Sequence, residues 1–315
     1  MRSPLARLTR VRRPGDVHRA ASTPPRWLLA SPRYASRSIP VGHDLERRTV
    51  LGFRVAIKVF RSPGANAGRT LSSAPAGIGS SGLAGAAGAA GRRPSFVLVH
   101  GIGVSSRYFH PLAALLAEHG DVHAVDLPGY GESPRVRRDV TLADHAAVVA
   151  EVVRMHGLVD PVIVGHSMGA QIVAQLAVDQ PGIADRIVLI GPTLDPRKRG
   201  VVRAGLALGR DTLREPLMSN AVVLGDYFLR CGMPYYLRQL PHLIGDRIED
   251  RAGRIRARTL VVVGHRDAVV DRSFAEGLAT LIPRGSVHVA RGPHVVMFTD
   301  PEGVARAIVE HARVD

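Results

Sequence analysis

From Ser95 onward, short apolar runs alternate with segments of helical periodicity along the chain. Six runs are strand-like: "SFVLVHG", "DVHAVDLPG", "PVIVGHS", "DRIVLIGP", "RTLVVVGHRD" and "SVHVARGPH". Continuous rather than alternating hydrophobicity is typical of strands buried on both faces of a parallel sheet. Repeated strand and helix units therefore predict an α/β fold with a mostly parallel central sheet flanked by helices.

One of the intervening helices is predicted in detail, from Thr141 to His156. Thr141 and Asp144 have the spacing of a capping box, an apolar face follows at helical intervals, and Gly157 ends the helix. Earlier in the chain, "RRTVLGFRVAIKVF" has the β-branched, partly alternating character of one or two strands.

The alternation is interrupted once, by about 60 residues that lack buried-strand runs and carry Arg-rich amphipathic stretches. An insertion of this size between two sheet strands cannot be a tight connection. We therefore expect a helical cap over the carboxyl ends of the strands, where open α/β sheets place their ligand sites.

These observations divide the chain into four parts. We expect a disordered Arg/Pro-rich tail over 1–43, the first part of the core over 44–191, the helical cap over 192–253 and the second part of the core over 254–315. A Gly/Ala-rich segment, 62–94, has too little apolar bulk to pack and is predicted to be a flexible insertion in the first part.

The formal charge of +15 would be consistent with a nucleic-acid-binding protein, but the distribution of the charge along the chain argues against that function. The stretch from Met1 to Gly42 holds nine Arg and one acidic residue, so more than half of the excess lies in the tail. Of the 42 basic residues only Lys58 and Lys198 are Lys, which a GC-rich coding bias explains. No basic helix, aromatic stacking platform or zinc motif accompanies the charge, and we expect no nucleic-acid partner.

The sequence also lacks clear motifs for export, for a membrane-spanning helix and for a cofactor. The apolar runs are far shorter than the roughly 20 residues of a membrane-spanning helix, and "WLLA" is too short for a signal peptide. Cys231 is the only cysteine, so no intramolecular disulfide can form and a cytoplasmic location is expected. No Cys/His cluster has zinc spacing, and "HGIG" lacks the third glycine of a dinucleotide fingerprint. We expect no metal and no cofactor.

The first chemical candidate is Ser167, in the segment "PVIVGHSMGAQ". Its Gly-His-Ser-Met-Gly pentapeptide lies between a predicted strand and a predicted helix. In that context a G-x-S-x-G motif forms a strained turn that presents the serine hydroxyl at the top of the sheet. The pentapeptide alone is a weak signal, so its partners must decide.

A serine hydroxyl needs a base to become a nucleophile, and the base needs an acid to orient it. Asp267 follows the strand-like run "TLVVVGHR", and His294 follows "SVHVARGP". We assign Asp267 as the acid and His294 as the base. Asp195 follows the preceding strand and stays open as a rival acid.

A tetrahedral oxyanion also needs two preset hydrogen-bond donors. The residue after the nucleophile, Met168, is expected to supply one backbone N–H at the start of its helix. The second is expected from Ile102, in the loop "VLVHGIGVSS" after an earlier strand.

At this point the chain resembles the α/β-hydrolase fold superfamily, in its group of capped single-domain serine hydrolases. The blocks "HGIG", "DLPGYGES", "GHSMGA", "GHRDAVV" and "GPHVVMFTDP" match the blocks of that family in order. The resemblance implies the roles proposed above for Ser167, Asp267 and His294. The low-complexity insertion, the Arg-rich tail and Phe109, where many relatives carry Trp, are departures that do not touch this chemistry.

Several further residues have both a structural and a functional interpretation. We interpret His100 as a structural member of the oxyanion loop and His166 as a packing neighbour of Ser167, while Asp126 is expected to bind loop amides. Four aromatic residues of the predicted cap could line an acyl pocket or form the core of the cap itself: Tyr227, Phe228, Tyr235 and Tyr236.

The sequence thus predicts a cofactor-independent serine hydrolase that cleaves a small-molecule carboxylic ester, thioester or lactone through an acyl-enzyme. The same residues also serve C–C bond hydrolysis, cofactor-free haloperoxidation and acyl transfer, which the fold alone does not separate. A non-catalytic ligand-binding protein is the alternative of a different class. The substrate and the oligomeric state stay open.

Overall fold

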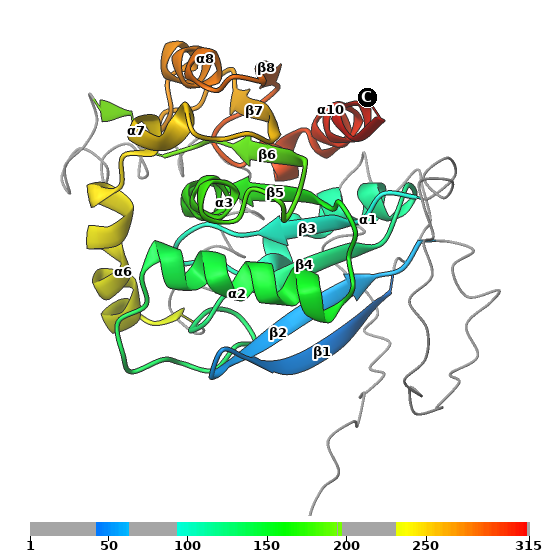
Figure 1. The fold of residues 1–315 in the computed structure, drawn as a ribbon, viewed down its shortest axis with the longest axis vertical. Coiled ribbons are helices and arrows are strands. Elements are labelled where there is room, and N and C mark those ends of the chain that lie inside the picture. The colour runs from blue at the N-terminus through cyan, green and yellow to red at the C-terminus, as the bar shows by residue number, and fades with distance from the viewer. Residues whose placement is uncertain (1–41, 63–92, 194, 197–230, 314–315) are drawn as a thin grey trace, which may run out of the picture.

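The structure is a computed structural model that describes residues 42–62, 93–193, 195–196 and 231–313. Eight strands in these residues form one central sheet (Figure 1). In chain order they are β1 (His43–Val50), β2 (Phe53–Phe60), β3 (Phe96–Val99), β4 (Val122–Asp126), β5 (Val162–His166), β6 (Arg186–Ile190), β7 (Arg258–Gly264) and β8 (Gly285–Ala290). Their order across the sheet is β1-β2-β4-β3-β5-β6-β7-β8.

The sheet is antiparallel only at one edge, where β2 pairs with β1 on one side and β4 on the other. All other neighbouring strands are parallel. The predicted mostly parallel sheet is therefore confirmed, and each of the six strand-like runs contributes one of the strands β3 to β8.

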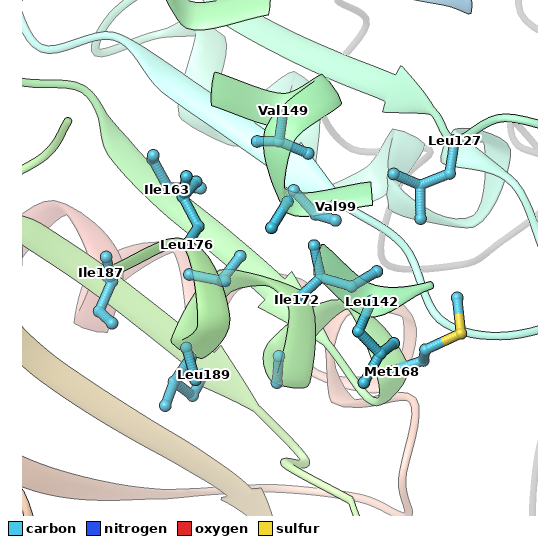
Figure 2. Close-up of a cluster of buried hydrophobic side chains, with 14 of the residues drawn as sticks. Val99, Leu127, Leu142, Val149, Ile163, Met168, Ile172, Leu176, Ile187 and Leu189 are labelled. Atoms are coloured by element: carbon cyan, nitrogen blue, oxygen red, sulfur yellow. The ribbon is translucent and has the colours of Figure 1, made fainter. Parts of the chain in front are cut away.

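Helices cover both faces of this sheet (Figure 1). The helices of the described residues are α1 (His110–Ala117), α2 (Leu142–Met155), α3 (Met168–Asp179), α6 (Met233–Gly245), α7 (Ile248–Ala252), α8 (Arg272–Leu281), α9 (Val296–Thr299) and α10 (Pro301–Arg313), with a 3-10 turn, η3 (Ser106–Phe109). The helices α2, α3 and α8 pack on one face, and α1, α9 and α10 pack on the other. Figure 2 shows the hydrophobic core on the first of these faces, where Val149 of α2 and Ile172 and Leu176 of α3 lie together with Val99 and Ile163 of the sheet.

The segment "RRTVLGFRVAIKVF" forms two strands rather than one. Leu51 and Gly52 separate them with φ angles of 49° and 80°, the positive values that a two-residue hairpin turn of type I′ requires. The strands pair in full register from His43 opposite Phe60 to Val50 opposite Phe53.

The predicted capping box is present at the start of α2. The Thr141 Oγ1 atom accepts a hydrogen bond from the Asp144 N–H at 3.1 Å, and the Asp144 carboxylate accepts one from the Thr141 N–H at 2.9 Å. The helix ends at Met155, followed by Gly157 with a φ of +58°. Both ends agree with the sequence-based prediction.

The direction in which successive strands are added changes at the carboxyl ends of β3 and β5. After β3 the chain continues to β4 on one side of it, and after β4 it crosses to β5 on the other side. Such a topological switch point is where open α/β sheets bind their ligands. Ser167 follows β5 and Ile102 follows β3, so both candidate residues lie at this switch point.

Within the predicted cap, 192–253, the structure describes α6 and α7 and a few flanking residues. Figure 1 shows α6 beside one end of α2 and α3. Buried side-chain amides attach α6 to the core: Gln239 Nε2 donates to the Val140 carbonyl at 2.9 Å, and Gln171 Nε2 donates to the Leu243 carbonyl at 3.0 Å.

Several predictions fall outside the described residues. These are the tail up to residue 41, the insertion over 63–92 and the cap residues 194 and 197–230, which include Tyr227 and Phe228. No helix among the described residues combines the length and apolar character needed to cross a bilayer.

Candidate active site

Ser167 lies in a sharp turn between β5 and α3. Its φ and ψ angles are 56° and −119°, a strained conformation for a residue with a side chain. The Ser167 N–H donates to the Ile190 carbonyl at the end of β6, at 2.9 Å. Strain of this kind persists only where the surroundings impose it, and it is a feature of functional sites.

The two glycines that flank the turn are required by space. A Cβ atom at Gly165 would lie 2.2 Å from the Gly169 carbonyl oxygen, and a Cβ atom at Gly169 would lie 2.2 Å from the Val99 carbonyl oxygen. Both distances are far below any real carbon contact. The glycines therefore allow the start of α3 to lie directly against the ends of β5 and β3.

Asp267 and His294 form a buried pair at the carboxyl ends of β7 and β8. The His294 Nδ1–H donates to the Asp267 Oδ2 atom at 2.9 Å, and the two side chains are only 5% and 0% exposed. The other carboxylate oxygen, Oδ1, accepts the N–H groups of Val269 and Val270, each at 2.8 Å. With three donors the carboxylate is held in one orientation, and His294 is held in the tautomer that has its proton on Nδ1.

Contacts of His166, the residue before Ser167, bring the turn at Ser167 and His294 together. The imidazole rings of His166 and His294 lie 4.7 Å apart between centroids, and His166 Nε2 donates to the His294 carbonyl oxygen at 3.2 Å. Burial, with the neighbouring His294 as the next cause, holds the pKa of His166 well below 6.5, so this ring is neutral. The interpretation of His166 as a packing neighbour omitted these hydrogen bonds.

Asp195, the rival acid, is also buried, at 1% exposed. The carboxylate that contacts His294 Nδ1 is that of Asp267. The geometry thus favours Asp267 in the position of the orienting acid.

Gly191 is a residue of this site that sequence reasoning missed. It follows β6 with a φ of +50°, and a Cβ atom there would lie 2.7 Å from Cε1 of His294. The only signal in the sequence was a glycine directly after a strand, which is equally typical of an ordinary turn.

The two segments that are expected to supply the oxyanion donors lie beside Ser167. Met168 is the first residue of α3, so its N–H is one of the four that have no acceptor within the helix. The residue before Ile102 is Gly101, where a Cβ atom would lie 3.1 Å from the Cβ atom of Ser167. The loop that carries Ile102 is therefore in close contact with the serine.

Two buried polar residues support this loop, in agreement with their structural interpretation. His100 Nε2 accepts the Leu127 N–H at 3.0 Å, and its Nδ1 lies 2.8 Å from the Gly101 carbonyl. Asp126 accepts the Ser106 N–H at 2.7 Å. Burial alone would raise the pKa of Asp126, but the charge of Lys58 and hydrogen bonds from Ser106 and Glu132 are among the causes that outweigh it and hold the pKa below 3.8.

Of the cap aromatics, the structure describes Tyr235 and Tyr236, which are 3% and 8% exposed. The Tyr235 hydroxyl donates to the Pro128 carbonyl at 2.8 Å, and the centroid of the Tyr235 ring lies 5.2 Å from the centroid of the Tyr130 ring. Tyr235 therefore attaches α6 to the loop after β4. In the described part of the chain no group of three or more His, Cys, Asp or Glu side chains is arranged to hold a metal ion.

The fold is that of an α/β hydrolase, and comparison with known proteins agrees. Residues 96–307 match the model of the alpha/beta hydrolase family, and the chain belongs to that family. The predicted resemblance is thereby confirmed.

The curated relatives match only parts of the chain, at modest sequence identity. An uncharacterized protein of Mycobacterium tuberculosis is 29% identical over 199 residues, which cover 59% of this chain and 58% of that protein. The chain thus aligns with less than two thirds of this relative. The pimeloyl-[acyl-carrier protein] methyl ester esterase of Aeromonas salmonicida is 38% identical over 94 residues, which cover 29% of this chain and 35% of that protein.

Among solved structures, the enol-lactonase from Burkholderia xenovorans LB400 has a TM-score of 0.67 at 16% identity. The match covers 85% of this chain and 100% of that chain. At this level of identity the likeness shows the fold.

Proposed function

We propose that the chain is a serine hydrolase that cleaves a small-molecule carboxylic ester, thioester or lactone through an acyl-enzyme. The observation that carries this proposal is the buried 2.9 Å hydrogen bond between Asp267 and His294. It lies at the carboxyl ends of the parallel strands, where Ser167 also occupies its strained turn. Ser167 is the nucleophile, His294 the general base, and Asp267 the acid that orients the imidazole.

The reaction follows from the tautomer of His294. Because the proton of the neutral His294 ring is on Nδ1, where it forms the hydrogen bond to Asp267, Nε2 can accept the proton of the Ser167 hydroxyl as the hydroxyl oxygen attacks the substrate carbonyl carbon. The N–H groups of Ile102 and Met168 stabilise the resulting oxyanion. His294 returns the proton to the departing alcohol or thiol, then deprotonates a water molecule whose attack releases the acid and Ser167.

The names of the relatives support an acyl substrate. One is a methyl ester esterase and one structural neighbour is an enol-lactonase, and both names describe cleavage of an acyl–oxygen bond. Neither relative is close enough over its length to name the substrate of this chain.

We further propose that residues 192–253 form a cap that covers the site and selects the substrate. The attachment of α6 to the loop after β4 through Tyr235 supports this arrangement. The other cap aromatics, Tyr227, Phe228 and Tyr236, are proposed to line the acyl pocket or to pack within the cap.

The experiment that tests the proposed function is labelling with a fluorophosphonate, which reacts with activated serines and does not require the substrate to be known. We expect labelling of the wild type and none of Ser167→Ala. Ser286→Ala, which removes a serine hydroxyl at an exposed position of the edge strand β8, is the control and should label like the wild type.

A folded but unlabelled wild type would contradict the proposal and favour a non-catalytic binding protein. If labelling succeeds, a panel of esters, thioesters and lactones of graded acyl length follows. A labelled enzyme that cleaves none of them would favour C–C bond hydrolysis, haloperoxidation or acyl transfer on the same residues.

A further inference from the structure

Two buried side chains outside the proposed triad connect the three loops that the reaction requires. Tyr108, in η3, accepts the Gly101 N–H at its hydroxyl oxygen at 3.0 Å. The same hydroxyl donates to His166 Nδ1 at 2.8 Å. His166 Nε2 then donates to the carbonyl oxygen of His294 at 3.2 Å.

The direction of this hydrogen-bond chain is determined at each step. A carbonyl oxygen can only accept, so the proton of the neutral His166 ring is on Nε2 and its Nδ1 must accept from Tyr108. Burial raises the pKa of the Tyr108 hydroxyl, which therefore keeps its proton. The two side chains are 2% and 3% exposed, so water does not compete for these bonds.

The three backbone positions that the chain joins are each adjacent to a reacting group. Gly101 precedes Ile102, His166 precedes Ser167, and the accepting carbonyl belongs to His294 itself. The His166 ring also lies against the His294 ring, at 4.7 Å between centroids. A displacement of Tyr108 or His166 would therefore change the distances among the oxyanion donor, the nucleophile and the base.

We propose that Tyr108 and His166 are positioning residues that hold the oxyanion loop, the nucleophile turn and the loop of the base in one geometry. The inference rests on the proposed function of Ser167 and His294. A positioning role differs from a packing role in one respect. It requires the hydrogen-bonding atoms of Tyr108 and His166, whereas a packing role would require only the volume of their side chains.

Variants that keep the volume and remove single hydrogen bonds separate these roles. Tyr108→Phe keeps the ring and removes the hydroxyl from the centre of the chain. His166→Asn places an acceptor near the former Nδ1, whereas His166→Gln places a donor near the former Nε2. Thr259→Val is the control, because it removes another buried hydroxyl, which donates to the Ala257 carbonyl at 3.0 Å at the opposite end of the sheet.

The measurements are the second-order rate of fluorophosphonate labelling and the kcat and KM for p-nitrophenyl acetate, with the Tm of each variant. For Tyr108→Phe we expect the labelling rate and kcat to fall roughly 10- to 100-fold with KM nearly unchanged, as misplacement of reacting groups produces. His166→Asn and His166→Gln should each retain more activity than His166→Ala. Thr259→Val should react like the wild type.

A wild-type rate in Tyr108→Phe, or a fall confined to KM, would overturn the positioning role and leave the proposed function intact. An equal fall in Thr259→Val would show that lost stability is the cause, and would also overturn it. If the wild type is not labelled at all, the proposed function fails and this inference fails with it.

Discussion

Gly191 offers a sharp test of how the base is held, because one methyl group there would meet the imidazole of His294. In Gly191→Ala the new Cβ would lie 2.7 Å from Cε1 and 2.9 Å from Nδ1 of His294. The Gly191 N–H is bound to the Val262 carbonyl at 2.8 Å, so the backbone resists movement and the imidazole must yield. To reach an ordinary contact of 3.4 Å it must move by about 0.7 Å.

A displacement of this size is expected to reduce the rate of fluorophosphonate labelling roughly 10- to 100-fold. The positive φ of +50° adds a second effect, since a left-handed conformation destabilises a residue with a side chain by roughly 1–2 kcal/mol. The free energy of unfolding in urea should fall by about this amount, and Tm by about 2–4 °C per kcal/mol.

Gly157→Ala separates the two effects. Gly157 has a similar φ, +58°, but nothing lies within 4 Å of a Cβ placed there. We expect both variants to lose similar stability and only Gly191→Ala to lose its labelling rate. Equal labelling rates in the two variants would refute the reasoning that places His294 against Gly191.

Three further predictions follow from buried polar groups. Asp267→Asn should lower the labelling rate about 10⁴-fold because the imidazole loses its required tautomer, whereas a larger loss in Asp195→Asn would exchange the two assignments. Lys58→Met should lower the free energy of unfolding in urea by about 3–5 kcal/mol, because it leaves the Asp126 carboxylate, 3.4 Å away and 1% exposed, without its cation; unchanged stability would contradict this. Burial, the largest cause, lowers the pKa of His123 and His145 from 6.5 to about 4, so the unfolded chain binds these protons first. The full contribution of these neutral histidines to the free energy of unfolding should be present above pH 6.5, and it should fall by about 1.4 kcal/mol per pH unit for each histidine as the pH falls toward 4. Urea midpoints that do not change between pH 7 and pH 5 would disprove this prediction.

Most of the sheet could be predicted because each strand is a local pattern. The strands β3 to β7 are buried along almost their whole length, and the boundaries of α2 follow from Thr141, Asp144 and Gly157. The edge strand β8 is partly exposed and differs in this respect from the expected strand buried on both faces. The sequence does not decide between one and two strands for β1 and β2, because their turn contains Leu51 at a φ of 49° and leucine is not a residue that predicts a positive φ.

The sequence indicates which candidate residues follow a strand, but it does not indicate which of them are in contact. Ser167, Asp267 and His294 each follow a strand-like run, and so does Asp195. The choice between the two carboxylates depends on loop conformations, which place Asp267 at 2.9 Å from His294 Nδ1. For the same reason the sequence did not reveal the role of Gly191, whose need for space comes from a side chain about 100 residues later in the chain.

Parallel strands explain why so much of the chemistry meets at one place. All carboxyl ends of parallel strands lie at the same edge, so residues that follow different strands are brought together without any signal between them in the sequence. This rule brings the loops together only approximately, whereas proton transfer requires agreement within a few tenths of an ångström. The remaining precision must come from side chains that bridge loops. In this chain the bond from Tyr108 to His166 and the bond from His166 to His294 do so across 58 and 128 residues of sequence.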